Sequence, residues 1–313
     1  MGSQPPPSSL KKWIIAGRPW ALPASTMPVI FGTSLAVVIG PAAFSPGRFL
    51  LALAAMMILH TAANMLSDVF DFKRGLDREI TPVSGAIVRG WKTPSQVRAG
   101  SALMFFLGSA IGLYLVLVTG PVLLIIGAVG VIVGVFYSGL KPRALGDLAV
   151  FLNFGLLGSL GAWVVQTKSF SWIPLIWTVP MALLVSAILH ANNWRDSTSD
   201  KEKRVTTIAA ALGDRRSLYY YGFLIFAPFV IDSTLMLVRF FSAGSRIGMP
   251  ASFLLVGLAF PRAMDLWGRA RRRRAPRRPM DFLILDGATA NYNLVFGFLS
   301  TVAVWIHHIL GRL

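Results

Sequence analysis

Cysteine is absent from this sequence of 313 residues, and charged residues make up only 14% of it. The first absence excludes disulfide bonds, thiolate catalysis and metal sites with cysteine ligands. The second argues against a soluble fold, because a soluble domain usually carries about 25% charged residues. With 55% hydrophobic residues and a mean hydropathy of +0.64, the chain cannot cover its apolar surface with polar groups. We therefore expect an integral membrane protein that is solvated by the lipid bilayer.

The apolar residues are grouped in runs of about 20, the length that a helix needs to cross the hydrocarbon core of a bilayer. We predict an all-α, multi-pass fold with nine transmembrane helices. The predicted spans lie near residues 22–41, 48–67, 99–118, 121–138, 146–166, 172–192, 219–239, 249–267 and 290–310. Residues 1–15 are polar and proline-rich, and we expect a disordered tail there, followed by a single transmembrane domain over 16–313.

The distribution of basic residues supports this topology. With nine spans and a cytoplasmic N-terminus, 25 of the 30 lysines and arginines lie on the cytoplasmic side, as the positive-inside rule requires. The five on the other side are Arg48, Lys168, Arg239, Arg246 and Arg312. The densest basic run, 269–278, directly follows a predicted span, so we expect it to contact anionic lipid rather than nucleic acid.

Acidic residues are rare, and they gather where two of the spans end. The first group ends the second span and contains Asn64, Ser67, Asp68, Asp71 and, a little further on, Asp77. Asn64, Asp68 and Asp71 are separated by four and three residues, which places them on one face of a helix. We expect this face to lie at the cytoplasmic surface.

A second group ends the sixth span with the same local order of a Leu-His pair, asparagine and paired aspartates. It contains Asn193, Arg195, Asp196, Asp200 and Lys201. The two Leu-His pairs are 130 residues apart, which indicates a weak internal repeat of two four-helix halves with a ninth helix added. Repeats with functional residues at matching places are common in membrane proteins.

The residue types in both groups suggest a shared chemistry. Two clusters of carboxylates on facing helices repel one another unless a cation lies between them, and hard divalent cations prefer oxygen ligands. Magnesium typically uses one or two carboxylates and leaves its other positions to water and phosphate, while nearby lysine or arginine neutralises the remaining charge. The pattern therefore predicts a magnesium–diphosphate site at the membrane surface. The alternative is a pair of acidic, solvated loops without a function.

Residues 64–77, NMLSDVFDFKRGLD, and 192–200, NNWRDSTSD, resemble the two Asp-rich motifs of the UbiA superfamily of membrane prenyltransferases. The resemblance extends to Arg18-Pro19 and to the stretch 137–166, and it is greatest for the 1,4-dihydroxy-2-naphthoate polyprenyltransferases. It implies nine transmembrane helices around a central cavity. It also implies magnesium-dependent transfer of a polyprenyl group from its diphosphate to an aromatic acceptor, here in menaquinone biosynthesis.

The resemblance also implies roles for individual residues. Those that would hold magnesium and carry the catalysis are Asp68, Asp71, Asp196 and Asp200. Those that would bind the diphosphate or support the metal are Arg18, Asn64, Ser67, Asp77, Lys141, Asn193, Arg195 and Lys201.

Three departures from the family pattern are visible. Ser67 replaces the usual asparagine, and the lysine that often follows the second motif is missing, so its role is either absent or taken by Lys203 or Arg204. The loop SGLKPRA lacks a Gly-Gly-Pro element of the naphthoate branch. Because that loop lies near the acceptor side, other acceptors stay open, among them homogentisate, 4-hydroxybenzoate, a tetrapyrrole and glycerol phosphate.

Two functions from other classes also remain. A secondary transporter would use intramembrane polar residues as an ion path, but transporter sites lie near the bilayer midplane, whereas these aspartates lie at helix ends. A CDP-alcohol phosphotransferase also uses Asp-rich motifs, but its single compact signature is missing, since Asp286-Gly287-Ala288 lacks the acids that should follow.

Overall fold

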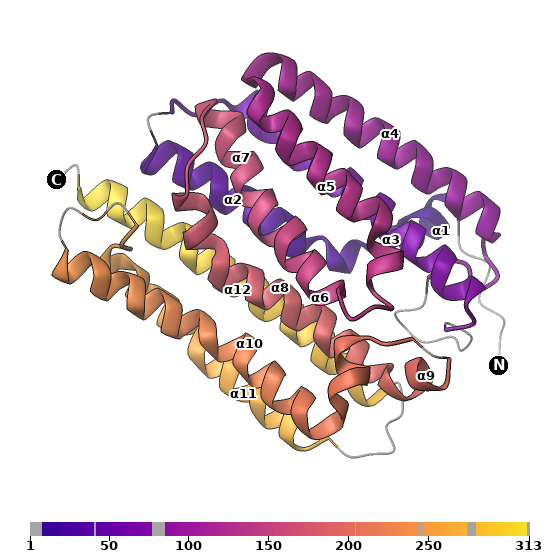
Figure 1. Ribbon diagram of the computed structural model, residues 1–313. Coiled ribbons are helices and arrows are strands. Elements are labelled where there is room, and N and C mark those ends of the chain that lie inside the picture. The colour runs from indigo at the N-terminus through magenta and orange to yellow at the C-terminus, as the bar shows by residue number, and fades with distance from the viewer. Residues whose placement is uncertain are drawn as a thin grey trace.

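The computed structural model describes residues 8–40, 42–76, 85–203, 205–242, 245, 247–273 and 280–311. Every regular element in these ranges is a helix, apart from one isolated bridge between Arg143 and Thr206. The long helices lie side by side in one bundle, with α4 at one edge and α10 and α11 at the other (Figure 1). The predicted all-α class is confirmed.

Seven helical segments in the described part of the chain are long and apolar enough to cross a membrane. They are α3 (Pro46–Lys73), α4 (Pro94–Thr119), α5 (Pro121–Leu140), the continuous segment Gly146–Thr167, α8 (Ile173–Arg195), α10 (Ile208–Phe241) and Leu285–Leu310 within α12 (Met280–Leu310). An eighth results if the stretch Ser9–Ala21 and α2 (Pro23–Val38), which meet at a 60° bend, form one span. The protein is therefore an integral, multi-pass membrane protein.

The predicted count of nine spans is not confirmed. The segment predicted as a span near 249–267 consists of a 3₁₀-helix, η3 (Ala251–Ala259), followed by α11 (Phe260–Arg271). The change to α-helix comes next to Pro261, a residue that favours the first turn of a new α-helix. Arg262 and Arg269 also make α11 more polar than a typical span.

The predicted disordered tail is too long. Residues Ser9–Ala16 form α1, and Ser8 caps it by accepting a hydrogen bond from the amide of Lys11. Trp13 packs against a small cluster that includes the buried Met65 and Val97, so this helix has an apolar face to bury. A serine cap and one apolar face are enough to form a short helix here. Residues 1–7 lie outside the described ranges.

Proline and capping residues determine where the long helices begin. Proline occupies the first turn of α2, α3, α4, α5 and α8, where its missing N–H costs nothing. At α4 the Thr93 hydroxyl accepts from the Gln96 amide at 3.2 Å, and the Gln96 side chain accepts from the Thr93 amide at 3.1 Å. This reciprocal cap fixes the start of a helix that packs along α3.

The described core lies where α2, α8, α10, η3 and α12 meet, around fully buried side chains such as Phe31, Tyr221 and Phe296. Large apolar side chains on the outside of α4, α5 and α10, such as Leu117, Ile125 and Val230, are exposed. In a bilayer these side chains contact lipid rather than water.

Loops from both halves of the chain meet at one end of the bundle. Arg74, just after α3, donates to the carbonyl of Ser138 near the end of α5 at 3.0 Å. The amide of Thr206, just before α10, donates to the carbonyl of Pro142 at 3.2 Å. Lys203 contacts the carbonyl of Gly75. The ends of α3, α5 and α8 therefore lie together, as do the two Asp-rich groups, which lie at the ends of α3 and α8.

Candidate active site

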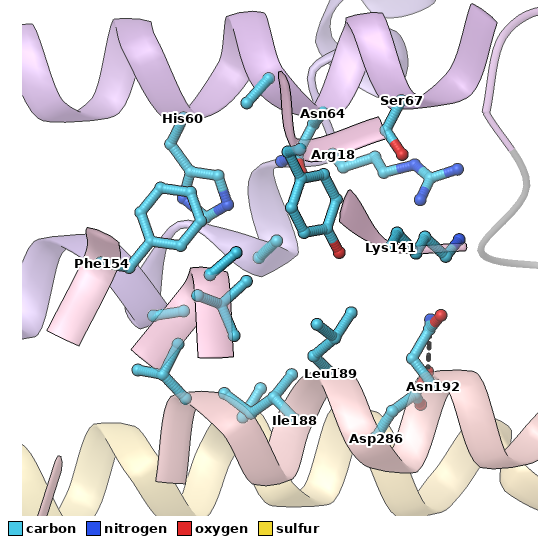
Figure 2. Close-up of a pocket in the computed structure, with 18 of the residues that line it drawn as sticks. Arg18, His60, Asn64, Ser67, Lys141, Phe154, Ile188, Leu189, Asn192 and Asp286 are labelled. Carbon is cyan, nitrogen blue, oxygen red and sulfur yellow. Dashed lines mark hydrogen bonds between the residues drawn. The ribbon is translucent and has the colours of Figure 1, made fainter. Parts of the chain in front are cut away.

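A cavity of about 790 Å³ opens between the helices at this end of the bundle. It is lined by side chains of α3, α5, the π-helix η2 (Phe151–Leu157), α8 and α12, together with the short 3₁₀-helix η1 (Pro19–Ala21) and Arg18 before it. Figure 2 shows its two different ends. Arg18, Ser67 and Lys141 lie toward one end, while His60 and Phe154 lie together at the other.

The first Asp-rich group lies on the face of α3 that the spacing predicts. Asp68 and Asp71 are buried, at 2% and 6% exposure. Arg18 forms an ion pair with Asp68, and the Lys141 Nζ lies 3.1 Å from the Asp71 Oδ2. The Ser67 hydroxyl donates to the same Asp71 oxygen at 3.4 Å. Two carboxylates from α3 are thus each paired with a cation from another element.

Arg18 reaches this position through an unusual backbone conformation. Its φ of +51° lies in the left-handed region, which non-glycine residues rarely adopt. This residue precedes η1 and forms the corner between α1 and α2. Strained residues of this kind persist where the surrounding structure holds them, often at functional sites.

The second Asp-rich group ends α8 and continues into α9 (Ser197–Glu202). Arg195 binds Asp196 with two nitrogens, Nε at 3.0 Å and Nη2 at 3.1 Å. Its Nη1 lies 2.6 Å from the Oδ2 of Asp286 on α12. Asn192 also donates to that oxygen, at 3.4 Å, as Figure 2 shows. Arg195 therefore connects the second motif to the last helix.

Asp200 connects the two groups electrostatically. It is buried at 3% exposure and accepts a hydrogen bond from the Thr207 hydroxyl at 3.4 Å. Burial raises the pKa of the Asp200 carboxyl to about 7; nearby Lys141 lowers it, and nearby Asp196 and Asp71 raise it. Residues from α3, α5 and α8–α9 thus act on one carboxyl, which means that the two motifs share one electrostatic environment.

The structure places the remaining predicted residues as follows. Asn64 lines the cavity and donates to the Gly17 carbonyl at 3.4 Å. Asn193 is buried and does not line the cavity, and Lys201 is exposed. Lys203, one of the two predicted replacements for the missing family lysine, does line the cavity. Asp77 and Arg204 lie outside the described residues.

Several cavity residues could not be predicted from the motifs. Asp286 is one of them, and its only sequence signal is an acidic residue beside an apolar run that becomes α12. Tyr137 is another, four residues before Lys141 and therefore on the same face of α5. His60 also lines the cavity, and its Nδ1 lies 2.8 Å from the Ser25 hydroxyl. Its ring also lies against Phe154, with centroids 4.2 Å apart.

The donor atoms at the polar end suit a hard divalent cation. Asn64, Asp71 and Asp196 line this end with amide and carboxylate groups, and carboxylate and amide oxygens are the preferred ligands of such cations. Among the described residues, no three carboxylate or imidazole side chains lie close enough together to hold a metal ion. Lys141 and Arg18 instead neutralise the aspartates, so a metal would enter by replacing these ion pairs.

Comparison with known proteins gives a consistent result. A model of the UbiA prenyltransferase family matches residues 25–285. The UbiA prenyltransferase domain-containing protein 1 homolog of Drosophila melanogaster is 30% identical over 307 residues, covering 96% of this chain and 80% of that protein. The UbiA prenyltransferase domain-containing protein 1 of Mus musculus is 33% identical over 298 residues, covering 93% and 83%.

Solved structures with low sequence identity share the fold. The apo structure of a UbiA homolog from Aeropyrum pernix K1 has a TM-score of 0.65 at 16% identity, covering 93% of this chain and 98% of that one. A UbiA homolog from Archaeoglobus fulgidus, bound to GPP and Mg²⁺, has a TM-score of 0.64 at 14% identity, covering 93% and 99%.

Proposed function

Since the chain belongs to the UbiA prenyltransferase family, we propose that it transfers a polyprenyl group from its diphosphate to an aromatic acceptor in a magnesium-dependent reaction. One observation carries this proposal: Asp71 and Asp196, from the two Asp-rich motifs, line a single cavity together with Arg18, Lys141 and Arg195. The homolog from Archaeoglobus fulgidus that was solved with GPP and Mg²⁺ supports the same ligand class.

The polar end of the cavity is suited to a magnesium–diphosphate. Asp68, Asp71, Asp196 and Asp200 would hold the metal, and Mg²⁺ would neutralise charge that develops on the leaving diphosphate. Basic side chains around the cavity bind the phosphate oxygens with charge-assisted hydrogen bonds. Those that line it are Arg18, Lys141, Arg195 and Lys203. When the metal takes the aspartates, Arg18 and Lys141 would exchange these carboxylates for phosphate oxygens, and cations held beside the leaving group stabilise the charge that develops on it.

The reaction that fits this arrangement is an electrophilic alkylation. The allylic C–O bond breaks, its electron pair leaves with the diphosphate, and the prenyl group becomes a carbocation. An electron-rich ring carbon of the acceptor attacks the cation, and the ring then loses a proton, or carbon dioxide where that carbon bears a carboxylate. Tyr137, Phe154 and aliphatic side chains of α8 line the cavity near the reacting group and exclude water that would quench the cation.

The proposal also specifies the acceptor and the side of the membrane on which the site lies. The sequence resemblance favours 1,4-dihydroxy-2-naphthoate as acceptor, in menaquinone biosynthesis, and the bias of basic residues places the site at the cytoplasmic face. Membership of a prenyltransferase family removes the support for the transporter alternative.

A product assay tests the proposal directly. Purified protein in detergent or vesicles is incubated with isotope-labelled prenyl diphosphate and a panel of aromatic acceptors, with and without EDTA. We expect a prenylated aromatic product, identified by mass, that appears only with free Mg²⁺. Full product formation after exhaustive chelation would contradict the metal requirement, and a preference for another acceptor would correct the naphthoate assignment alone.

A further inference from the structure

His60 projects from α3 into the cavity, at the end remote from Arg18 and Lys141 (Figure 2). It lies on the face of α3 that carries the first Asp-rich group. The residues of this face that line the cavity are His60, Asn64, Ser67 and Asp71, spaced by four, three and four. His60 precedes Asp68 by eight residues on the same helix, which at a rise of about 1.5 Å per residue is about 12 Å along the helix axis.

The imidazole of His60 is held in one tautomer by its neighbour on α2. Its Nδ1 lies 2.8 Å from the Ser25 hydroxyl. That hydroxyl also lies 3.0 Å from the carbonyl oxygen of Leu22, which can only accept, so the single hydroxyl hydrogen of Ser25 is donated there. The Ser25 oxygen therefore accepts from Nδ1 of His60, and Nε2 of the neutral ring is left as the acceptor.

The second ring nitrogen, Nε2, is accessible to a ligand. Within the described ranges it makes no hydrogen bond, yet it is not one of the buried polar atoms that lack a partner. The 4% of His60 that is exposed therefore includes this nitrogen, at the cavity wall. Phe154 of the π-helix η2 packs against the ring, with centroids 4.2 Å apart, and fixes its plane. Among the described residues that line the cavity, His60 is the one imidazole.

The position of His60 matches the part of the cavity that remains for the acceptor. The diphosphate occupies the end that carries the cations, and the carbon that is transferred is bonded to it. The acceptor ring therefore reaches that carbon from the rest of the cavity, where Nε2 of His60 lies. A hydroxyl group on the ring would meet an acceptor nitrogen there rather than another donor.

We infer that His60 is a catalytic residue that takes the proton of a hydroxyl group on the aromatic acceptor through Nε2. This inference rests on the proposed function and specifies its acceptor as a ring with a hydroxyl group ortho or para to the carbon that is alkylated. Moving the hydroxyl proton toward Nε2 raises the electron density at that carbon, where the prenyl cation adds. Ser25 is a positioning residue, because it acts through the tautomer of His60.

The proton returns to the product at the end of the reaction. As a π-electron pair of the ring forms the new C–C bond, the hydroxyl proton moves to Nε2, the oxygen becomes a ring ketone and the alkylated carbon becomes tetrahedral. That carbon then loses its proton to water, or its carboxylate as carbon dioxide, and the ring becomes aromatic again. The oxygen takes its proton back from His60, which regains its starting tautomer.

The test compares His60→Phe with His307→Phe. Phenylalanine keeps a flat ring but cannot take a proton. His307 is half-buried on α12 and does not line the cavity, so His307→Phe is the matched control. Each protein is assayed with one prenyl diphosphate and a series of aromatic acceptors whose hydroxyl groups differ in acidity, and folding is checked by thermal unfolding in detergent.

We expect kcat of His60→Phe with a weakly acidic acceptor to fall about 100-fold, on the scale of general base catalysis. KM for the prenyl diphosphate should stay near the wild-type value, because the end of the cavity that binds it is unchanged. The loss should shrink with more acidic acceptors and at higher pH, since a hydroxyl group that is already ionised needs no base. The control should behave like the wild type.

A second variant, Ser25→Ala, keeps the imidazole but releases its tautomer, and it decides the question if His60→Phe does not fold. It should show a smaller loss of kcat with the same dependence on acceptor acidity. A loss that is equal for all acceptors, or wild-type kcat in a folded His60→Phe protein, would overturn the inference and leave His60 as a structural partner of Ser25. A wild-type protein that prenylates no acceptor would instead refute the proposed function itself.

Discussion

At the scale of single residues, the site balances buried carboxylates against cations. Asp68 and Asp71 are each paired with one cation, and Arg195 is shared between Asp196 and Asp286. Removing one partner of a buried pair leaves the other charge uncompensated, which is why such pairs are sensitive to mutation. In the magnesium–diphosphate complex, the metal would pair with the aspartates and the diphosphate would pair with the cations.

The first prediction concerns pH and Asp200. Because burial raises the pKa of this carboxyl to about 7, it is protonated and unable to ligate a cation at lower pH. The apparent Mg²⁺ concentration for half-maximal activity should therefore rise about tenfold from pH 8 to about pH 6, as a proton and the metal compete for one group. Asp200→Asn should bind Mg²⁺ less tightly and lose most of this dependence. A steep dependence retained in Asp200→Asn would assign the effect to another group.

The pH dependence of folding stability that Asp200 causes has the opposite sign to that of most carboxylates. The folded pKa lies above the unfolded value of about 3.9, so the metal-free folded state holds this proton more tightly. Its contribution to stability is present at low pH and is lost as pH rises from about 4 through about 7. Added Mg²⁺ should reverse that loss near pH 8, which differential scanning fluorimetry with and without EDTA would detect.

The second prediction separates two exposed lysines in the same segment. Lys203 lines the cavity and Lys201 does not. Lys203→Gln should lower kcat/KM roughly fivefold, which corresponds to about 1 kcal/mol of activation free energy. The effect is small because solvent screens an exposed cation. Lys201→Gln serves as the matched control and should stay near the wild-type value. Similar losses of kcat/KM in both variants, measured with the same prenyl diphosphate, would mean that Lys203 contributes no more to phosphate binding than Lys201.

At the scale of single residues, the sequence predicts which chemical groups form the site better than it predicts which side chains contact one another. Asp68, Asp71 and Asp196 are visible because acids are rare and their spacing is helical. Asp286 and Tyr137 come from helices that carry no motif, and their places depend on how distant segments pack. Lys203, too, is distinguished from Lys201 only by the course of the loop after α9.

At the scale of elements, α12 is joined to α8 by the Arg195–Asp286 ion pair. The third prediction is that Asp286→Ala costs about 1.5–3 kcal/mol of unfolding free energy, because Arg195 loses a buried, charge-assisted hydrogen bond but keeps its ion pair with Asp196. It should also raise KM for the prenyl diphosphate, since Arg195 loses one of its two anchors.

The control for this variant is Asp265→Ala on α11. Asp265 pairs with Arg269 at 2.8 Å, but both side chains are about half exposed, so the loss should be at most about 0.5 kcal/mol. Thermal unfolding in detergent and steady-state kinetics provide the two measurements. If Asp286→Ala and Asp265→Ala had equal effects, the contact between α8 and α12 would not depend on this pair.

Elements with uniform apolar runs were predictable, and irregular ones were not. The helices α3, α4, α5 and α8 lie close to their predicted spans. The 3₁₀-helix η3 and the π-helix η2 interrupt runs whose hydropathy is continuous, so a measure of apolar content cannot detect them. The short helix α1 depends on a cap and on packing against α3 and α4, neither of which its composition reveals.

At the scale of the whole molecule, one end of the bundle is strongly basic and carries the cavity. The ends of α3, α5 and α8 meet there through the contacts of Arg74 and Lys203. On the positive-inside rule, we propose that this end faces the cytoplasm. The proposed site would then take the diphosphate from the aqueous side and the prenyl tail from the lipid.

The fourth prediction tests that topology. Because the natural chain has no cysteine, single cysteines at Lys73, Lys92 and Arg272 should react with an impermeant maleimide from one side of sealed vesicles. Cysteines at Arg48 and Lys168 should react from the other side. Labelling of any two positions of the first set from opposite faces would contradict the arrangement of the helices.

The overall architecture was largely predictable, because a lipid solvent allows few alternatives to apolar helices. The weak repeat also predicted that the two Asp-rich groups end helices at the same side, and the structure places them there.

The most direct test of a shared magnesium–diphosphate site is a double-mutant cycle on Asp71 and Asp196. These residues are far apart in sequence but line the same cavity. Each alanine variant should lose several kcal/mol of transition-state stabilisation, and the double variant should be little worse than either, because residues that act as a unit are strongly non-additive. Asp232→Asn, a buried acid near the other end of α10, is the control and should retain activity. Near-wild-type kcat/KM in a folded Asp71→Ala or Asp196→Ala protein, or fully additive losses in the double variant, would contradict a single site.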